Sequence, residues 1–234
     1  MSIKTVGLDA DDTLWHNEKL FREAEQCFVQ LLGRCADKKI IESILFSTIS
    51  RNLSLYGYGF KSFTLSMVET ASNIYKDVIP SSEMRAIVSL GQSMMDKPVN
   101  LIDGVVGVLD ALHKNYRLLL ISKGDLVEQR RKLEKSGLKS YFDAIEIVNH
   151  KDKTVYEELL KRNRVDANEF AMVGNSLKSD VLPALEAGAY AVHIPYDITW
   201  VHEMADEPDD NGRYFKADKL ADLPGLLKII NRKV

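Results

Sequence analysis

The chain has little cysteine and no strong excess of charge of either sign. Its two cysteines, Cys27 and Cys35, lie eight residues apart in one helical pattern, too far along a helix axis to pair with each other. We therefore expect reduced thiols, in the core or on a helix face, as in a cytoplasmic protein. The formal net charge of -3 leaves no general basic face, so we expect no nucleic-acid partner.

Long apolar runs and repeats are also missing. No run approaches the roughly 20 residues that cross a bilayer, and the amino terminus lacks the long apolar region of a secretion signal. These absences predict a cytoplasmic protein with no membrane partner. Hydrophobic residues make up 45% and charged residues 28% of the 234 residues, as in a globular enzyme. The length allows one large domain or a core with a smaller insertion.

The apolar pattern divides the chain into an interrupted sheet domain and a helical block. A first strand ends at Leu8, and from residue 17 to about 97 apolar residues recur at helix spacing. After Pro98 we expect strands at 117–122, 144–148, 170–173 and 190–194, alternating with helices near 104–114, 125–136, 153–163 and 179–187. This alternation predicts an α/β fold, a Rossmann-like parallel sheet covered on both faces. The predicted core comprises residues 1–15 and 99–234, and an all-helical cap, residues 16–98, is inserted after the first strand.

A dense acidic cluster directly follows the first apolar run. Residues 6–14 read Val-Gly-Leu-Asp-Ala-Asp-Asp-Thr-Leu, so the strand leads straight into Asp9, Asp11, Asp12 and Thr13. Three neighbouring carboxylates repel one another unless a cation neutralises them. Open α/β sheets place ligands at the carboxyl ends of their strands, where one of these carboxylates can attack while another moves a proton. The alternative is an acidic turn or helix start.

Polar residues also follow two later strands. Ser122-Lys123-Gly124 comes after the strand at 117–122, and its hydroxyl can bind a phosphoryl oxygen or cap a helix. Lys151, with Lys153 close by, precedes a helix. A lysine there opposes the helix dipole, which favours a nearby anion unless the lysine is a solvated loop residue.

A fourth polar segment follows the strand at 170–173. Residues 174–180 read Gly-Asn-Ser-Leu-Lys-Ser-Asp, and Asp180 opens the next helix. The hard oxygens of Asn175 and Asp180 suit Mg²⁺ and not zinc. Taken alone, Asp180 is equally a helix cap.

Taken in order, these four segments resemble the four motifs of the haloacid dehalogenase-like hydrolase superfamily. The first motif is similar to its Asp-x-Asp-x-Thr pattern, and the others match at Ser122, at Lys151 and at Gly174-Asn175-Ser176-x-x-Ser179-Asp180. The resemblance covers nearly the whole chain and points to the phosphatase branch with a helical cap between the first and second motifs. Spacing to Tyr156 favours Lys151 over Lys153 as the third-motif lysine.

The resemblance implies a role for each matching residue. Asp9 is the expected nucleophile, which becomes an aspartyl-phosphate, and Asp11 protonates the leaving oxygen and later deprotonates water. Mg²⁺ is the expected cofactor. Its implied ligands are the Asp9 carboxylate, the Asp11 backbone carbonyl, Asn175 and Asp180, and the implied phosphate-binding residues are Asp11, Thr13, Ser122, Lys123 and Lys151.

Two positions depart from the pattern of many family members. Asp12 stands where many carry glycine, so this extra acid is expected to point to solvent or to the helix start. Asn175 stands where many carry aspartate. An amide oxygen brings no charge, so the substitution predicts weaker Mg²⁺ binding.

The helical insertion follows the first strand directly, which suits a lid over the site. Its resemblance to the family's helical cap implies a small phosphorylated metabolite as substrate, and we expect a monomer or homodimer. The glycine-rich turn at residues 56–61 offers Tyr58 and Lys61 as substrate contacts, unless it is a plain helix–helix turn. Three other functions compete. A dehalogenase of the same superfamily lacks the second acid, so Asp11 argues against it. A receiver-like switching module is about half this length and has no helical insertion, and a non-catalytic binding protein would not need usable chemistry at all four motifs.

Overall fold

The computed structural model describes residues 2–76, 78–209 and 211–233, and the chain folds into two compact units. The first comprises residues 1–18 and 99–234, and the second comprises residues 19–98. Across the described ranges, no helix is both long enough and apolar enough to cross a membrane.

The first unit is built on a six-stranded sheet in the order β3-β2-β1-β4-β5-β6, in which all neighbouring strands are parallel. Its strands are β1 (Thr5–Leu8), β2 (Arg117–Lys123), β3 (Ala144–Val148), β4 (Phe170–Gly174), β5 (Tyr190–His193) and β6 (Tyr214–Lys216). The predicted α/β fold with a parallel sheet is therefore confirmed. Leu8 pairs with Leu120 on β2 and Val173 on β4, so the carboxyl ends of these three strands lie at one edge.

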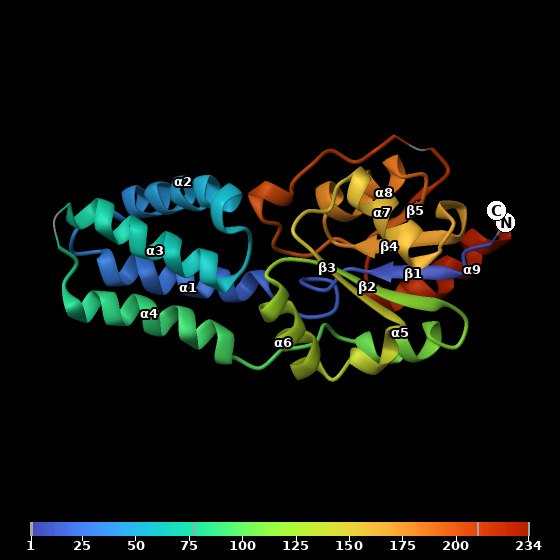
Figure 1. Ribbon diagram of the computed structural model, residues 1–234, viewed down its shortest axis with the longest axis horizontal. Helices are drawn as coiled ribbons and strands as arrows, with labels where there is room; N and C mark the ends of the chain where they lie inside the picture. The colour runs from blue at the N-terminus through green and yellow to red at the C-terminus, as the bar shows by residue number, and fades with distance from the viewer. Residues whose placement is uncertain (1, 77, 210, 234) are drawn as a thin grey trace. The chain divides into compact units, whose positions relative to one another are not determined.

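Helices cover both faces of this sheet (Figure 1). One apolar cluster packs β1, β2, β4 and β5 against α5 (Val105–Leu112), α6 (Leu126–Ser136) and α9 (Leu223–Lys233). A second packs the opposite face against α7 (Lys153–Asn163) and α8 (Leu182–Glu186). Successive strand residues point to opposite faces, so Leu118 and Leu120 join the first cluster and Leu119 and Ile121 the second.

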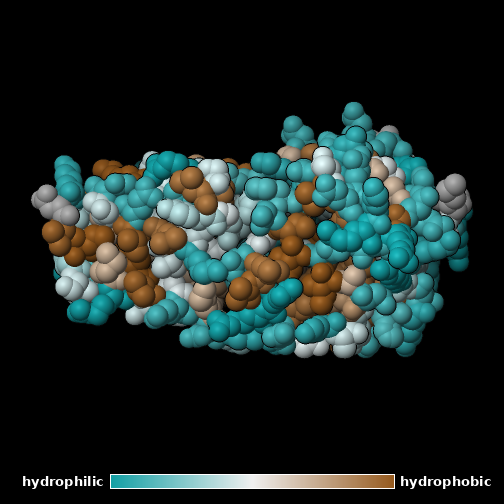
Figure 2. Space-filling view, in the orientation of Figure 1, coloured by the Kyte–Doolittle hydropathy of each residue, from teal (hydrophilic) through white to brown (hydrophobic). Residues whose placement is uncertain are grey.

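The second unit contains four helices: α1 (Glu18–Leu32), which starts at the last residue of the first unit, α2 (Lys38–Tyr56), α3 (Phe60–Tyr75) and α4 (Ser81–Asp96). Buried residues at helix spacing form its core, among them Phe28, Ile41, Leu45, Met67 and Ile87. Figure 2 shows apolar residues in patches on both units in the view drawn. Single exposed apolar side chains such as Phe46 and Leu65 are usual on protein surfaces.

The structure corrects several details of the sequence analysis. The helix expected at 179–187 is a π-helical turn, Leu177–Val181, followed by α8. Strand β6 and helix α9 were not predicted, nor were the 3₁₀ turns Lys139–Tyr141, Ala167–Glu169, Val201–Glu203 and Leu220–Asp222. Cys27 lies exposed on α1, and Cys35 lies exposed beyond its end, so neither thiol is in the core.

The two connections between the units run beside each other within the sheet unit. The Ile102 N–H donates to the Leu14 carbonyl at 2.9 Å, and the His16 N–H donates to the Asn100 carbonyl at 2.9 Å. Trp15 and Leu101 form an antiparallel bridge between them. The helical insertion therefore leaves and re-enters the sheet unit at one place.

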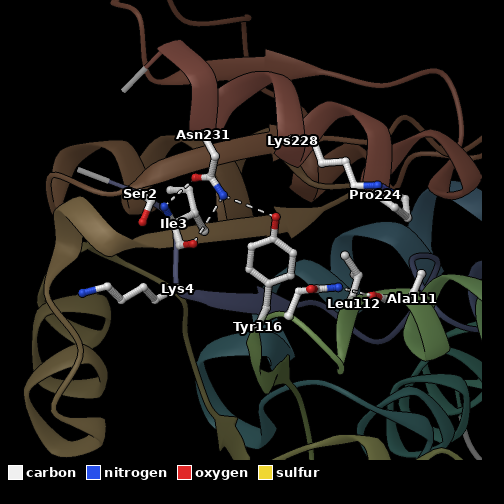
Figure 3. Close-up of a pocket in the computed structure, with 10 residues that line it drawn as sticks. Ser2, Ile3, Lys4, Ala111, Leu112, Tyr116, Pro224, Lys228 and Asn231 are labelled. Carbon is white, nitrogen blue, oxygen red and sulfur yellow. Dashed lines mark hydrogen bonds between the residues drawn. The ribbon is translucent and has the colours of Figure 1, made fainter.

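A pocket of about 410 Å³ lies where β1 and β2 begin, at the edge of the sheet opposite their carboxyl ends (Figure 3). Its polar groups bond to one another: the Asn231 side chain accepts from the Ile3 N–H at 2.6 Å and donates to Tyr116 Oη at 3.3 Å. These contacts tie helix α9 to Ile3, two residues before β1, and to Tyr116, the residue before β2.

Candidate active site

The acidic loop after β1 is a tight turn. The Asp9 N–H donates to the Val173 carbonyl at 2.9 Å, which extends the pairing of β1 with β4 by one residue. The chain then turns back, because the Ala10 carbonyl accepts from the N–H groups of Thr13 at 3.3 Å and Leu14 at 2.8 Å. Asp9, Asp11 and Thr13 are thereby held at the carboxyl end of β1.

Asp12 points to the helix start and not to solvent. Its carboxylate accepts from the N–H groups of Asn17, at 2.8 Å, and Glu18, at 3.0 Å. It therefore caps the N-terminus of α1, which begins at Glu18. Burial raises its pKa to about 7, although the Asn17 N–H opposes that rise. Its φ of 62° is left-handed, a backbone conformation that glycine adopts more easily than aspartate does.

A buried lysine joins two of the predicted site carboxylates. Lys151 Nζ lies 2.5 Å from Asp9 Oδ1 and 2.6 Å from Asp180 Oδ1, and its side chain is only 1% exposed. Burial raises the pKa of Asp9 to about 7, with a further rise from Asp180 and an opposing effect from Lys151. Burial also opposes the charge of Lys151, but the two carboxylates outweigh it and raise its pKa. Lys153 is instead exposed and pairs with Glu157 at 3.6 Å.

The loop after β4 completes this cluster. Thr13 Oγ1 lies 3.2 Å from Asn175 Oδ1 and 3.3 Å from Asp9 Oδ2, so it brings the first and fourth motifs together. Asp180 Oδ2 accepts from the Ser176 N–H at 3.0 Å. A Cβ at Gly174 would lie 2.2 Å from that same oxygen, so only glycine leaves room for the Asp180 carboxylate.

The second motif places its two polar residues differently. Ser122 is 1% exposed, and among the described residues its Oγ has no hydrogen-bond partner. A buried hydroxyl in this state has capacity to bind a ligand oxygen. Lys123 instead directs its ammonium to Ser179 Oγ at 2.9 Å and to the carboxylate of Glu203. Sequence reasoning gave no role to Glu203, whose pKa is lowered because Lys123, Ser176 and Ser179 outweigh its burial.

Asp11 has three side-chain partners that the sequence analysis missed. Its carboxylate accepts from Trp15 Nε1 at 2.6 Å, Gln129 Nε2 at 2.8 Å and Lys132 Nζ at 2.8 Å. Gln129 and Lys132 lie three residues apart on α6, so both project from one face of that helix. The spacing of Gln129 and Lys132, with Leu133 in the core beside them, was the signal in the sequence that these two polar residues share a face of the helix.

Tyr58 and Lys61 belong to the other unit. They lie at the connection between α2 and α3, where Tyr58 is half-buried and Lys61 is exposed in the first turn of α3. A substrate contact from either residue remains a prediction.

The donor set fits a hard cation. Asp9, Asp180 and Asn175 each offer side-chain oxygen atoms, and Lys151 brings one positive charge against the two carboxylates of Asp9 and Asp180. Within the described ranges no group of three or more His, Cys, Asp and Glu side chains is placed to hold a metal. Mg²⁺ is commonly held by one or two carboxylates with water and substrate oxygens, so two suffice for this ion.

Fold and site together define an enzyme class with a parallel sheet and an acidic centre at the carboxyl ends of its strands. The chain belongs to the haloacid dehalogenase-like hydrolase family, whose model matches residues 37–194, and the predicted family is confirmed. A solved haloacid dehalogenase-like family hydrolase from Xanthomonas campestris is 36% identical, with a TM-score of 0.88, over 99% of this chain and 93% of that one.

Two curated relatives are phosphatases. N-acylneuraminate-9-phosphatase of Mus musculus is 30% identical over 141 residues, covering 57% of this chain and 54% of that protein. The chain thus spans about half the length of this relative. Glyceraldehyde 3-phosphate phosphatase of Methanothermobacter thermautotrophicus is 26% identical over 205 residues, covering 84% of this chain and 88% of that protein.

Proposed function

We propose that this protein is a Mg²⁺-dependent phosphatase that hydrolyses a small phosphomonoester through an aspartyl-phosphate. The observation that carries the proposal is Lys151 between Asp9 and Asp180, with Asp11 two residues beyond Asp9. Phosphoryl transfer needs positioned groups and neutralised charge more than it needs unusual side chains. The phosphatase names of the curated relatives support the same reaction.

In the proposed reaction, a carboxylate oxygen of Asp9 attacks phosphorus as the bond to the leaving alkoxide oxygen breaks. In its protonated form, Asp11 donates a proton to that oxygen, and the alcohol departs. Asp11, now ionised, takes a proton from a water that attacks the phosphoryl group, which releases inorganic phosphate and restores Asp9. Lys151 and the Ser122 hydroxyl bind phosphoryl oxygens during both steps.

The Asp9 carboxylate, the Asp11 backbone carbonyl, Asn175 and Asp180 would hold the Mg²⁺. When bound, this ion supplies positive charge that offsets the phosphoryl oxygens and the neighbouring carboxylates. Asn175→Asp adds a charged oxygen ligand, so we expect half-maximal activity at a lower Mg²⁺ concentration, and Asp180→Ala should require a higher one. If neither variant shifts that concentration, the fourth motif does not bind the metal.

The decisive experiment is a panel of phosphomonoesters assayed with Mg²⁺, Mn²⁺ or Co²⁺, with and without the metal. Asp9→Asn should abolish turnover, because an amide is not a competent nucleophile. Rapid quenching of the wild-type reaction followed by peptide mass analysis should locate phosphate on Asp9. An inactive wild-type protein rejects the phosphatase proposal, and phosphate on another residue reassigns the nucleophile.

The substrate class is supported by the names of two relatives, an N-acylneuraminate-9-phosphatase and a glyceraldehyde 3-phosphate phosphatase. A small phosphorylated metabolite is therefore the expected substrate here. A dehalogenase remains the alternative within the family, and a 2-haloacid in the same panel tests it. Cytoplasmic location, and a monomer or homodimer, remain predictions.

A further inference from the structure

The carboxylate of Asp11 is held from two separate elements. Trp15 donates from the same loop, and Gln129 and Lys132 donate from α6, more than 110 residues further along the chain. Lys132 Nζ lies 2.8 Å from both carboxylate oxygens. An aspartate with one partner keeps rotational freedom, whereas donors from both elements fix the direction of this carboxylate.

Lys132 is itself fixed by further contacts. Its Nζ donates to Asn17 Oδ1 at 3.0 Å and lies 3.4 Å from Glu128 Oε1, and its side chain is only 9% exposed. Burial opposes its charge, but Asp11 and Glu128 outweigh that cost and raise the pKa of Lys132, so the ammonium stays charged. Gln129 also donates to the Lys123 carbonyl at 3.0 Å, which ties α6 to the end of β2.

Stability alone is a weak reason for such an arrangement. A buried ion pair often contributes no more than well-packed apolar residues of the same size, because both charges lose their water. Here the ion pair is centred on the residue to which the proposed reaction assigns both proton transfers. A misplacement of a proton donor by about 1 Å can cost on the order of 100-fold in rate, so the arrangement has a chemical consequence.

We propose that Lys132, assisted by Gln129, is a positioning residue that holds Asp11 in the direction needed for its proton transfers. The proposal rests on the proposed phosphatase function and adds to it a residue outside the four motifs. A positioning role through Asp11 affects only steps in which Asp11 moves a proton. The expected signature is therefore that the loss of rate in a variant depends on the leaving group of the substrate. A purely structural role would not produce this dependence.

The test compares two kinds of phosphomonoester. Cleavage of 2,4-dinitrophenyl phosphate needs no proton on its leaving group, whereas cleavage of an alkyl phosphate does. For Lys132→Met we expect kcat/KM to fall at least about tenfold for the best alkyl phosphate of the panel and to change little for the aryl phosphate. We also expect a burst of dinitrophenolate, because hydrolysis of the aspartyl-phosphate still requires Asp11 as base.

Three variants make the result interpretable. Lys135→Met places the same substitution on an exposed position of the same helix and should leave both substrates unaffected. Gln129→Met removes one uncharged donor and should produce a smaller loss with the same selectivity, which keeps the test available if Lys132→Met fails to fold. In an Asp11→Asn background, Lys132→Met should add little further loss.

The outcomes separate the two proposals. An inactive wild-type protein overturns both of them. An active wild type in which Lys132→Met and Gln129→Met slow the alkyl and aryl substrates by the same factor, without a burst, overturns the positioning role and leaves the phosphatase function standing. Selective loss on the alkyl substrate, with a burst, supports it.

Discussion

The carboxylate of Asp180 occupies the space that a side chain at Gly174 would need, because a Cβ at position 174 would lie 2.2 Å from Asp180 Oδ2. Gly174→Ala should therefore displace the Asp180 carboxylate, lower the free energy of unfolding by about 1–3 kcal/mol and reduce activity. Gly107→Ala is the matched control, since nothing lies within 4 Å of a Cβ there and alanine favours its helix. Urea unfolding and the phosphatase assay check both variants. Equal behaviour of the two would contradict the steric argument.

Asp12 should make stability depend on pH. Its pKa is about 7 in the folded protein against 3.8 for an ordinary aspartate, so the folded state binds the proton more tightly and the free energy of unfolding falls as pH rises from about 4 to above 7. Asp12→Asn keeps an N-capping side chain, tolerates the left-handed φ and does not titrate. We expect the variant to lose less stability than the wild type between pH 5 and pH 8 in urea unfolding. If the free energy of unfolding of the variant and of the wild type changes with pH by the same amount, Asp12 is not the titrating group.

Glu203 should matter for stability well beyond an ordinary surface carboxylate. It accepts from Ser176 at 2.6 Å and Ser179 at 2.5 Å and pairs with Lys123, with 16% of its side chain exposed. Glu203→Gln leaves Lys123 with its charge uncompensated, so we expect a loss of about 2–3 kcal/mol in the free energy of unfolding.

The matched control for Glu203 is Glu207→Gln. Glu207 pairs with Lys216 in an exposed position, where the same change should have a much smaller effect on the free energy of unfolding. The prediction fails if chemical unfolding gives equal losses for the two glutamates.

The turn between α2 and α3 should affect which substrates are cleaved. Replacing Tyr58 and Lys61 together with alanine should alter the ranking of phosphomonoesters while sparing a small aryl phosphate that makes few contacts beyond its phosphoryl group. Lys38→Ala, at the start of α2, serves as a control on the same unit. A uniform loss over all substrates would mean that the turn is structural.

The regular elements near the site could be predicted from sequence. Strand β3 and helix α7 have the predicted bounds, because β-branched residues and helix spacing give clear signals and Asp152 caps the helix. The four motifs occur at the ends of β1, β2 and β4 and before α7, where they were expected, because parallel strands bring their carboxyl ends to one edge.

The missed features depend on tertiary contacts. The π-helical turn before α8 places Asp180 beside Lys151, and local spacing indicates only an ordinary helix there. Lys123 turns to Glu203, 80 residues away, and Asp11 meets Lys132, 121 residues away. No local pattern identifies Glu203 as the partner of Lys123 or Lys132 as the partner of Asp11. Strand β6 has three residues and no buried run, so periodicity could not detect it.

The hydrogen bonds between Leu14 and Ile102 and between His16 and Asn100 have an evolutionary consequence. The insertion enters and leaves through two adjacent segments joined by an isolated bridge, so its exchange for a longer, shorter or unrelated segment requires no change in the order or direction of the six strands. Recombination at this place can therefore replace the insertion and leave the residues at the carboxyl ends of the strands unchanged. One sheet scaffold can in this way carry different insertions in different proteins.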